Sequence, residues 1–395
     1  MASAQIRSAE ISFIGTGDCG PVHGPAAGFP IERYTELVRP VLHSVDLRFA
    51  NCERQYSSRG IASETSPHGC QPPEMAQIFT DCEFDAVTIA NNHMYDYGPD
   101  ALLDTRDLLL GKGIGVTGAG RDLEEARQPA IVERNGVRVG FLGYCSVIPE
   151  GGEAAPGKVG IAPLRIKTEY EGRGPHASPR VITHPDERDM RMILDDVARL
   201  RREVDIVVVA FHWGVIWVPR VIADYQVVTA HACIDAGADL ILGHHAHVPK
   251  AIEVYKGKAV FYSLSNFCMT KPFPSPKWSE APWAHGSLRN YTDQNPEYPL
   301  LPYGRDAVER VIGLHVCLLP HGSWADGQRT RQHPATREPA YRPPPRPLSR
   351  SSSRDIGATL PAGRDGDPAR GRGGEYSVAW MRPGRVCCED AHQAS

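Results

Sequence analysis

Residues 239–247 read DLILGHHAH, a short apolar run that leads into three histidines. Residues 205–214 read DIVVVAFHWG and repeat the pattern, because an apolar run again leads into a histidine, His212. Continuous apolar runs of this length fit parallel strands that are buried on both faces. The two segments therefore predict strands of an α/β sheet, each with imidazole groups at its carboxyl end.

Further apolar runs along the chain end in polar residues of a few types. These residues are Asp18 after ISFIG, Asn51 and Glu53 after DLRFA, Asn91, Asn92 and His93 after DAVTIA, and Asn266 after AVFYSLS. Ligands of open α/β sheets bind in the crevice outside the carboxyl ends of the strands. A series drawn from Asp, Glu, Asn and His is typical of a hard or borderline metal site.

Helical patterns separate these runs, which indicates an α/β fold with helices covering a sheet. Residues 187–203 place apolar side chains on one helical face, and 100–110 and 220–236 are two further helix candidates. The expected strands are 11–14, 47–50, 86–90, 137–143, 206–211, 240–242 and 259–264. Residues 270–303, rich in Pro, Trp and Asn, are predicted to form a long loop.

The polar strand ends suggest a specific chemistry if they meet. Carboxylates from Asp18 and Glu53 balance the charge of divalent cations, His245 and His247 add imidazole ligands, and the Asn92 amide oxygen can bridge two ions. Two ions roughly 3.5–4 Å apart activate water and stabilise a phosphoryl transition state. His93 is then placed to donate a proton to the leaving oxygen. Taken singly, Asp18, Asn92 and Glu53 are more simply a cap, a turn and a solvated loop charge, and His212 fits a packed histidine as well as a ligand. The GHHAH segment alone favours a metal site.

Composition excludes several classes of protein. The 395 residues contain 43 Lys+Arg and 47 Asp+Glu, a net charge of −4, so no global basic field favours nucleic-acid binding. No apolar run reaches the roughly 18–20 residues of a membrane-spanning helix, so no integral membrane segment is expected. The start lacks a secretory signal pattern, and the ten cysteines are too dilute for a disulfide scaffold. A cytoplasmic location is the expectation.

The composition changes near residue 318. Residues 319–395 are rich in Arg, Pro and Gly and poor in aliphatic side chains, so we expect a disordered tail after one domain at 1–318. The same bias suggests a hypothesis in which the reading frame is shifted after about residue 316, with a natural basic tail as the alternative.

The motifs resemble a known family. TIANNHMYDYGPDALLDT at 88–105, DIVVVAFHWG at 205–214 and AGADLILGHHAHVPKAIEVYKGKAVFYSLSNF at 236–267 are similar to the CapA-type capsule (poly-γ-glutamate) synthesis family of the calcineurin-like metallophosphoesterase superfamily. The resemblance covers about residues 10–316. It implies a β-sandwich flanked by helices, in four layers α-β-β-α, and one or two ions of Mn, Fe or Zn. The implied metal residues are Asp18, Glu53, Asn92, His212, His245 and His247, with His93 as acid/base and Asn51, Asp96, His244 and Asn266 in support.

Three functions follow from this resemblance. The first is a metallophosphatase-like hydrolase that acts on a phosphoester or on a glutamyl or peptide-like polymer. The family's usual Asp-x-His motif is Asp18-Cys19-Gly20 here, and Cys52 precedes Glu53. These changes motivate a second function, a metal-independent peptide epimerase in which Cys19 or Cys52 acts with Asp18, His93 or His212. The third is a non-catalytic accessory protein of polymer synthesis. The oligomeric state is left open.

Overall fold

The computed structural model describes residues 11–21, 30–63, 70–216, 218, 221–269 and 314–318. The first of two six-stranded sheets has the order β15–β1–β2–β3–β4, and β16 pairs with the amino-terminal half of β1. Its strands are β1 (Ile11–Cys19), β2 (Leu47–Cys52), β3 (Ala86–Thr88), β4 (Gly115–Thr117), β15 (Asn266–Cys268) and β16 (Leu314–Leu318). The strands run parallel, except that β16 is antiparallel to β1.

The second sheet has the order β13–β14–β12–β11–β7–β6. Its strands are β6 (Ala130–Arg134), β7 (Val137–Cys145), β11 (Ile206–His212), β12 (Leu240–His244), β13 (Ile252–Tyr255) and β14 (Lys258–Phe261). The four central strands are parallel, whereas β6 and β13 are antiparallel to their neighbours at the two edges. The apolar runs at 206–211 and 240–242 form strands of this sheet, as predicted, and the structure makes them parallel neighbours.

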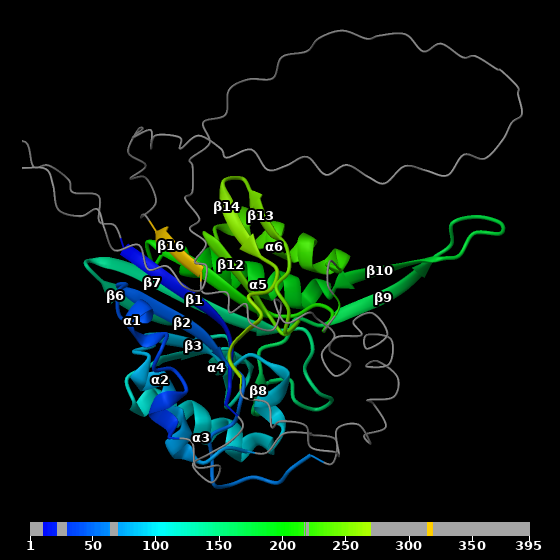
Figure 1. The fold of residues 1–395 in the computed structure, drawn as a ribbon. Helices are drawn as coiled ribbons and strands as arrows, with labels where there is room; N and C mark the ends of the chain where they lie inside the picture. Colours follow the sequence, from blue (N-terminus) through cyan, green and yellow to red (C-terminus); the bar gives the residue numbers. More distant parts are fainter. Residues whose placement is uncertain are drawn as a thin grey trace, which may run out of the picture. The chain divides into compact units, whose positions relative to one another are not determined.

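Three clusters of buried side chains define four layers. Between the sheets, Phe49 of β2 stacks on Phe141 of β7 with ring centroids 4.8 Å apart. A second cluster joins the outer face of the first sheet to α2 (Gln77–Asp81) and α3 (Gly98–Gly111). A third joins the outer face of the second sheet to α5 (Glu187–Leu200) and α6 (Asp224–Ala236). The predicted four-layer α-β-β-α architecture is thus confirmed (Figure 1).

The helices follow the predicted patterns closely. α5 begins after Asp186, whose carboxylate caps the helix by accepting from the backbone N–H groups of Arg188 and Asp189. α6 begins at Asp224 rather than at 220 and ends before Gly237, which adopts a φ of 120°. The short helices are α1 (Arg39–Leu42), α4 (Leu123–Ala126) and the 3₁₀ turns Ile31–Arg33, Pro73–Ala76 and Asn92–Tyr95.

A two-stranded ribbon was not predicted from the sequence. Strands β9 (Ile166–Glu171) and β10 (Arg180–Pro185) form an antiparallel hairpin that projects from the sheets (Figure 1). Most of its side chains are exposed on both faces, so it carries no buried apolar stripe that sequence periodicity could reveal. A second small ribbon joins β5 (Ala119–Gly120) to β8 (Gly160–Ile161).

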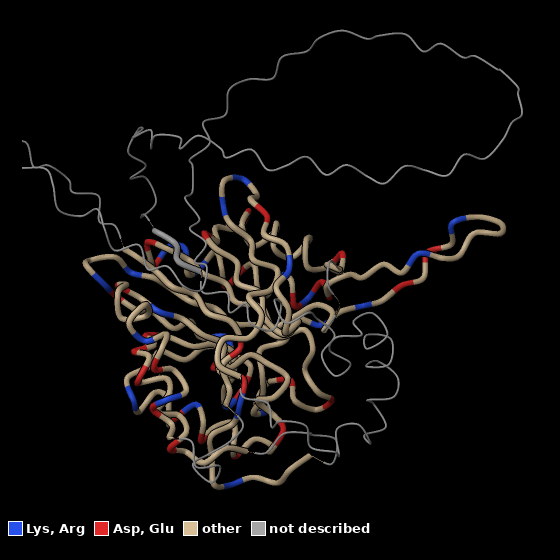
Figure 2. The backbone as a smooth tube through the Cα atoms, in the orientation of Figure 1, with Lys and Arg blue, Asp and Glu red and all other residues tan. Residues whose placement is uncertain are grey.

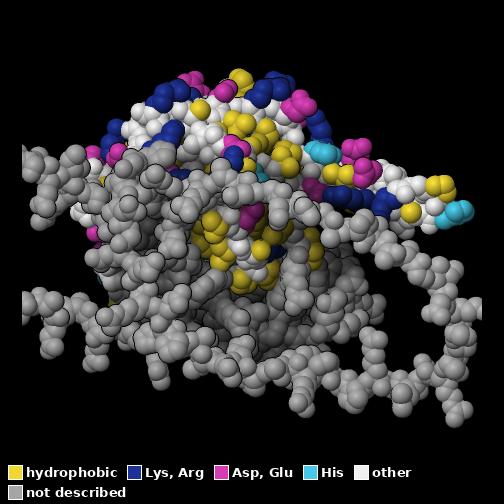
Figure 3. Space-filling model, turned by 90° about the horizontal axis from the view of Figure 1, so that it is seen from above, with side chains coloured by type: hydrophobic (Ala, Val, Ile, Leu, Met, Phe, Trp, Pro, Cys, Tyr) yellow, Lys and Arg dark blue, Asp and Glu magenta, His cyan; other side chains and the backbone are white. Residues whose placement is uncertain are grey.

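Charges of both signs are mixed over the described surface. Lys and Arg alternate with Asp and Glu along the backbone rather than forming a stripe (Figure 2). In the view from above, charged side chains of both signs border the hydrophobic ones (Figure 3). In the described part of the chain, no helix has the length and apolar character that a membrane span needs. The predicted loop at 270–303 and the predicted tail at 319–395 lie outside the described residues.

Candidate metal centre

The carboxyl ends of the parallel strands in both sheets meet at one edge of the sandwich. In the first sheet, Asp18 of β1 pairs with Asn51 of β2. In the second sheet, His212 of β11 pairs with His244 of β12. The Nδ2 atom of Asn51 lies 3.2 Å from Nδ1 of His212, so the strand ends of the two sheets are in direct contact. The predicted convergence of these residues is therefore present in the structure.

Asp18 is fully buried at the end of β1. Its Oδ1 accepts a hydrogen bond of 2.8 Å from the Asn51 amide, and its Oδ2 accepts one of 3.2 Å from the backbone N–H of His245. Oδ2 also lies 3.4 Å from Nδ1 of His247. Burial raises the pKa of the Asp18 carboxyl to about 7, with the hydrogen bond from Asn51 opposing that rise.

Glu53 follows β2 and is also fully buried. Its Oε1 lies 3.6 Å from Nε2 of His212 and 3.6 Å from Nε2 of His247. Ligand atoms of Asp18, Glu53 and His247 all lie within 4.8 Å of one another. Two carboxylates without solvent contact carry a large desolvation cost unless cationic charge compensates them. This donor set therefore fits a divalent cation.

A second group of donors adjoins the first. Nε2 of His212 lies 2.7 Å from Oδ1 of Asn92 and 3.2 Å from Nδ1 of His245. Because Nε2 of His212 is also near Glu53, the Glu53 carboxylate stands between the two groups of donors. Burial lowers the pKa of His245 to about 3 and holds that of His212 well below its ordinary value. Both imidazoles are therefore neutral at pH 7, which is the form that binds a metal.

The segment after β12 has an unusual backbone that orients two of the histidines. His245 has a φ of 87° and His247 a φ of 54°, in the left-handed region that side chains other than glycine rarely adopt. Such conformations cost of order 1–3 kcal/mol each and cluster at functional sites. Here they place the ring of His247 beside the carboxylates of Asp18 and Glu53, and Nδ1 of His245 3.2 Å from Nε2 of His212.

The first and last strands of this site approach closely at Gly17. A Cβ atom on Gly17 would lie 1.9 Å from the carbonyl oxygen of Ser265, so no other residue fits. The approach lets the backbone N–H of Asp18 donate to Ser265 at 2.8 Å. It also brings β15 to the site, where Oδ1 of Asn266 lies 2.6 Å from Nδ1 of His247. Asn266 therefore orients the His247 ring.

His93 lies beside the two donor groups without joining either. Its Nδ1 lies 2.9 Å from Oδ2 of Asp96, and its Nε2 lies 3.2 Å from Nδ2 of Asn92. The Asp96 carboxylate fixes the proton on Nδ1, which leaves Nε2 directed at the site. Burial lowers the pKa of His93, with the hydrogen bond to Asp96 opposing that effect. This arrangement is typical of an acid/base histidine.

Asn91 is a buried residue of the site that the sequence placed at a strand end without assigning it a role as ligand or support. Its Nδ2 donates to Oδ1 of Asn51 at 3.0 Å and to the Cys52 carbonyl at 2.8 Å. Its Oδ1 accepts from the backbone N–H of His93 and so caps the 3₁₀ turn that carries Asn92 and His93. Only its position at the end of β3 indicated a role, and that signal was shared with Asn92.

His244 belongs to the interior of the sandwich rather than to either donor group. Its Nε2 lies 3.2 Å from the Thr16 carbonyl oxygen of β1, so the imidazole links the two sheets beneath the site. Burial lowers its pKa to about 4. The predicted supporting role of His244 is therefore one of holding β12 against β1.

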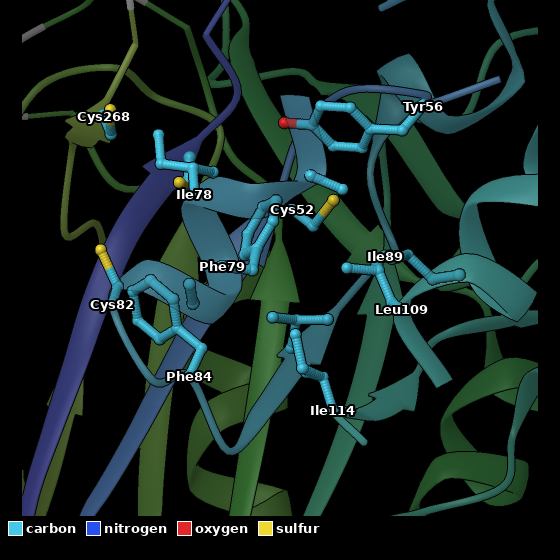
Figure 4. Packing of buried hydrophobic residues seen from close by; sticks show 14 of the residues in the cluster. Cys52, Tyr56, Ile78, Phe79, Cys82, Phe84, Ile89, Leu109, Ile114 and Cys268 are labelled. Carbon is cyan, nitrogen blue, oxygen red and sulfur yellow. The ribbon is translucent and has the colours of Figure 1, made fainter. Parts of the chain in front are cut away.

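Cys19 and Cys52 lie on the opposite face of the first sheet from the carboxylates. Successive strand residues point to opposite faces, so Asp18 faces the site while Cys19 does not. Both thiols belong to the apolar cluster under the helices, and Figure 4 shows Cys52 beside Tyr56 and Phe79. Burial raises the pKa of Cys52 to about 12 and that of Cys19 well above its ordinary value. This placement does not support catalytic thiols, and the epimerase hypothesis loses the groups that distinguish it.

Comparison with known proteins defines the family. Residues 12–271 match the family model described as "Bacterial capsule synthesis protein PGA_cap", and the chain belongs to this family. The "PGA biosynthesis protein CapA" of Bacillus subtilis (strain 168) is 29% identical over 235 residues, 59% of this chain and 55% of that protein. A "Probable polyglutamine synthesis accessory protein" of Mycobacterium tuberculosis is 33% identical over 232 residues, 56% and 55% of the two chains.

These similarities have limits. The chain spans about half the length of the curated relatives that it matches. Among solved structures, the calcineurin-like phosphoesterase YfkN of Bacillus subtilis aligns with a TM-score of 0.37 and 14% identity, covering 62% of this chain and 73% of that one. A similarity at this level does not bear on function. Family membership therefore rests on the sequence match. The chemistry of the site is argued from its geometry alone.

Proposed function

We propose that this chain is a metal-dependent hydrolase whose substrate is a phosphoester or a glutamyl or peptide-like polymer. The observation that carries the proposal is the position of Glu53. One buried oxygen of this carboxylate is equally distant, at 3.6 Å, from Nε2 of His212 and from Nε2 of His247. A carboxylate between two groups of neutral nitrogen and oxygen donors is suited to a pair of divalent cations.

The residues divide into two ligand groups that share Glu53. Asp18 and His247 would hold one cation, and Asn92, His212 and His245 would hold the other. Mn, Fe and Zn all accept carboxylate and imidazole ligands. When bound, such ions activate water as a nucleophile and neutralise negative charge on the reacting group.

His93 performs the proton transfer in this proposal. Its Nδ1–H is held by Asp96 and its Nε2 accepts from the Asn92 amide, so a ring that takes up a second proton at Nε2 would exchange that contact for the leaving oxygen or nitrogen. Asn92 connects His93 to His212 through its amide, with its nitrogen near His93 and its oxygen near His212. The acid is therefore fixed relative to the ligands. Asp96 positions His93 and does not touch substrate.

Hydrolysis assays with Mn²⁺ test the proposal. The purified full chain, freed of metal and then supplied with Mn²⁺, is assayed on bis-p-nitrophenyl phosphate and on poly-γ-glutamate. We expect Glu53→Gln to lower kcat/KM at least about 100-fold, and His93→Asn to lower kcat roughly 100- to 10,000-fold. His176→Asn, in the exposed loop of the ribbon, is the matched control and retains wild-type rates. Cleavage of neither substrate under any metal condition would reject the proposal.

A non-catalytic accessory role in polymer synthesis is the second candidate. It is favoured by the printed name of the mycobacterial relative, an accessory protein. The two candidates differ in cells that depend on this protein for polymer. A folded His93→Asn variant that supports normal polymer formation favours the accessory role, whereas loss of polymer favours catalysis. A cytoplasmic location remains a prediction, which fractionation of the same cells tests.

A further inference from the structure

Arg54 is a buried cation with few partners. It follows Glu53 directly, and the residue is only 3% exposed. Its Nη1 donates to the carbonyl oxygen of Glu53 at 3.0 Å. Among the described residues, no carboxylate lies within 4.0 Å of its guanidinium nitrogens, and its Nε has no hydrogen-bond acceptor. Arginine is almost never this buried unless an anion pairs with it.

Arg48, at the other end of β2, shows what a structural arginine looks like in this fold. It is 8% exposed, and its Nη1 lies 3.3 Å from the carboxylate of Asp85. Its Nε donates to the Leu42 carbonyl and its Nη2 to the Val45 carbonyl. The guanidinium of Arg48 is therefore paired with protein groups, whereas that of Arg54 lacks an anionic partner in the described chain.

The side chain of Arg54 is held at the candidate metal centre. Its stem crosses Gly20, where a Cβ atom would lie 2.5 Å from Cγ of Arg54. Gly20 is two residues beyond Asp18, and Nη1 donates to the backbone carbonyl of Glu53, so the side chain lies along the two segments that carry these carboxylates. Its charge acts on Asp18 and His93 of the site and also on Cys52 and Tyr56 of the adjoining apolar cluster, which places the guanidinium at the boundary between the two.

We infer that Arg54 forms an oxyanion-binding subsite of this centre. The planar guanidinium with free N–H groups suits a phosphoryl or carboxylate group, which both present paired oxygens. An oxyanion here would supply the charge partner that Arg54 lacks and would lie next to His93. The inference rests on the proposed function, because it assigns to the substrate of that hydrolase an anionic group beside the bond that is cleaved. Binding of the oxyanion itself is tested separately.

The test titrates the full-length protein with inorganic phosphate and, in a second arm, with glutarate, by calorimetry, both metal-free and with Mn²⁺. We expect Arg54→Gln to weaken binding of the preferred anion at least about tenfold and Arg54→Lys to weaken it less. Arg188→Gln, an exposed arginine at the start of α5, is the control and binds as wild type does. Phosphate preference indicates a phosphoryl group, and glutarate preference indicates a carboxylate.

Two readouts keep the outcome interpretable. Circular dichroism confirms that each variant is folded, and Mn²⁺ titration shows whether the ligand groups remain intact. Anion binding that depends on Arg54 without any Mn²⁺ binding supports the subsite while rejecting the proposed function. Equal anion affinity in wild type, Arg54→Gln and Arg54→Lys overturns the inference, as does wild-type protein that binds neither anion.

Discussion

Nε2 of His212 lies 2.7 Å from Oδ1 of Asn92, although 120 residues separate them in the chain. His212 ends β11 of the second sheet, and Asn92 begins the turn after β3 of the first. The contact therefore crosses the sandwich at the edge where the parallel strands of both sheets end.

Removing the Asn91 side chain should destabilise this edge of the sandwich. Asn91→Ala leaves the buried Asn51 oxygen and the Cys52 carbonyl without their donor. We expect the free energy of unfolding to fall by about 2–3 kcal/mol, because buried polar groups lose their hydrogen bonds. Urea unfolding measures the change, with the exposed Gln128→Ala as control. An Asn91→Ala midpoint equal to that of the control would contradict the assigned role.

Gly17→Ala should separate β1 from the segment that carries Asn266. The new methyl would overlap the Ser265 carbonyl, so the backbones must move apart. We expect lower stability and a weaker affinity for Mn²⁺, because Asn266 no longer orients His247. Gly172→Ala, at an exposed position where a Cβ atom meets nothing within 4 Å and φ is not positive, is the matched control for the loss of glycine alone. Mn²⁺ affinity lost equally in both variants would argue against a specific effect at Gly17.

The metal-free protein should lose stability in mild acid. The unfolded chain protonates its histidines near pH 6.5, whereas burial lowers the pKa of His244 to about 4 and that of His245 to about 3 in the fold. The unfolded state then binds more protons as the pH falls from 6.5 to 4, which favours unfolding. Asp18 acts in the opposite sense, because its pKa is raised to about 7 in the fold.

His244 and His245 against Asp18 give a net loss of about 3 kcal/mol between pH 6.5 and 4, and His212 and His93, whose pKa values burial also lowers, act in the same direction. Urea unfolding in the presence of a chelator, at a series of pH values across this window, measures it. A free energy of unfolding that stays constant or rises on acidification would show that these imidazoles are not buried in neutral form.

The buried thiols should be dispensable for chemistry. Cys19→Ala and Cys52→Ala remove sulfur from the apolar cluster, so we expect a loss of about 1 kcal/mol in stability from the smaller side chain. Hydrolysis rates and Mn²⁺ affinity should stay near wild type. Loss of activity in a variant that binds Mn²⁺ normally would restore the thiols as catalytic groups, and α-carbon deuterium exchange on peptides would then test epimerisation.

Much of this fold could be predicted from continuous apolar runs. Those at 206–211 and 240–242 are apolar on both faces because helices cover one face of the sheet and the other sheet covers the opposite face. The predicted strand at 11–14 was too short, since β1 continues through Gly15-Thr16-Gly17 to Cys19. Glycine weakens a strand pattern, and here it marks a close backbone approach.

The residue types of the site could be predicted from the sequence. The face of the strand to which each side chain points could not. The strand-end rule selected Asp18, Glu53 and the histidines because it depends only on where apolar runs end. It could not separate Asn91 from Asn92, or Cys19 from Asp18, because a one-residue shift along a strand reverses the face. No sequence pattern indicated a role for Arg54, since the burial of a charged residue depends on the tertiary structure.

The central claim is that Asp18, Glu53 and the three histidines His212, His245 and His247 bind divalent cations. Calorimetric titration of the metal-free full chain with Mn²⁺ tests it most directly, with Glu53→Gln beside an exposed control, Glu150→Gln. We predict saturable binding of one or two ions to the wild type and the control, and a loss of at least about tenfold in affinity for Glu53→Gln. Wild-type protein that takes up no Mn²⁺, or that binds it as tightly after Glu53→Gln, would contradict the claim.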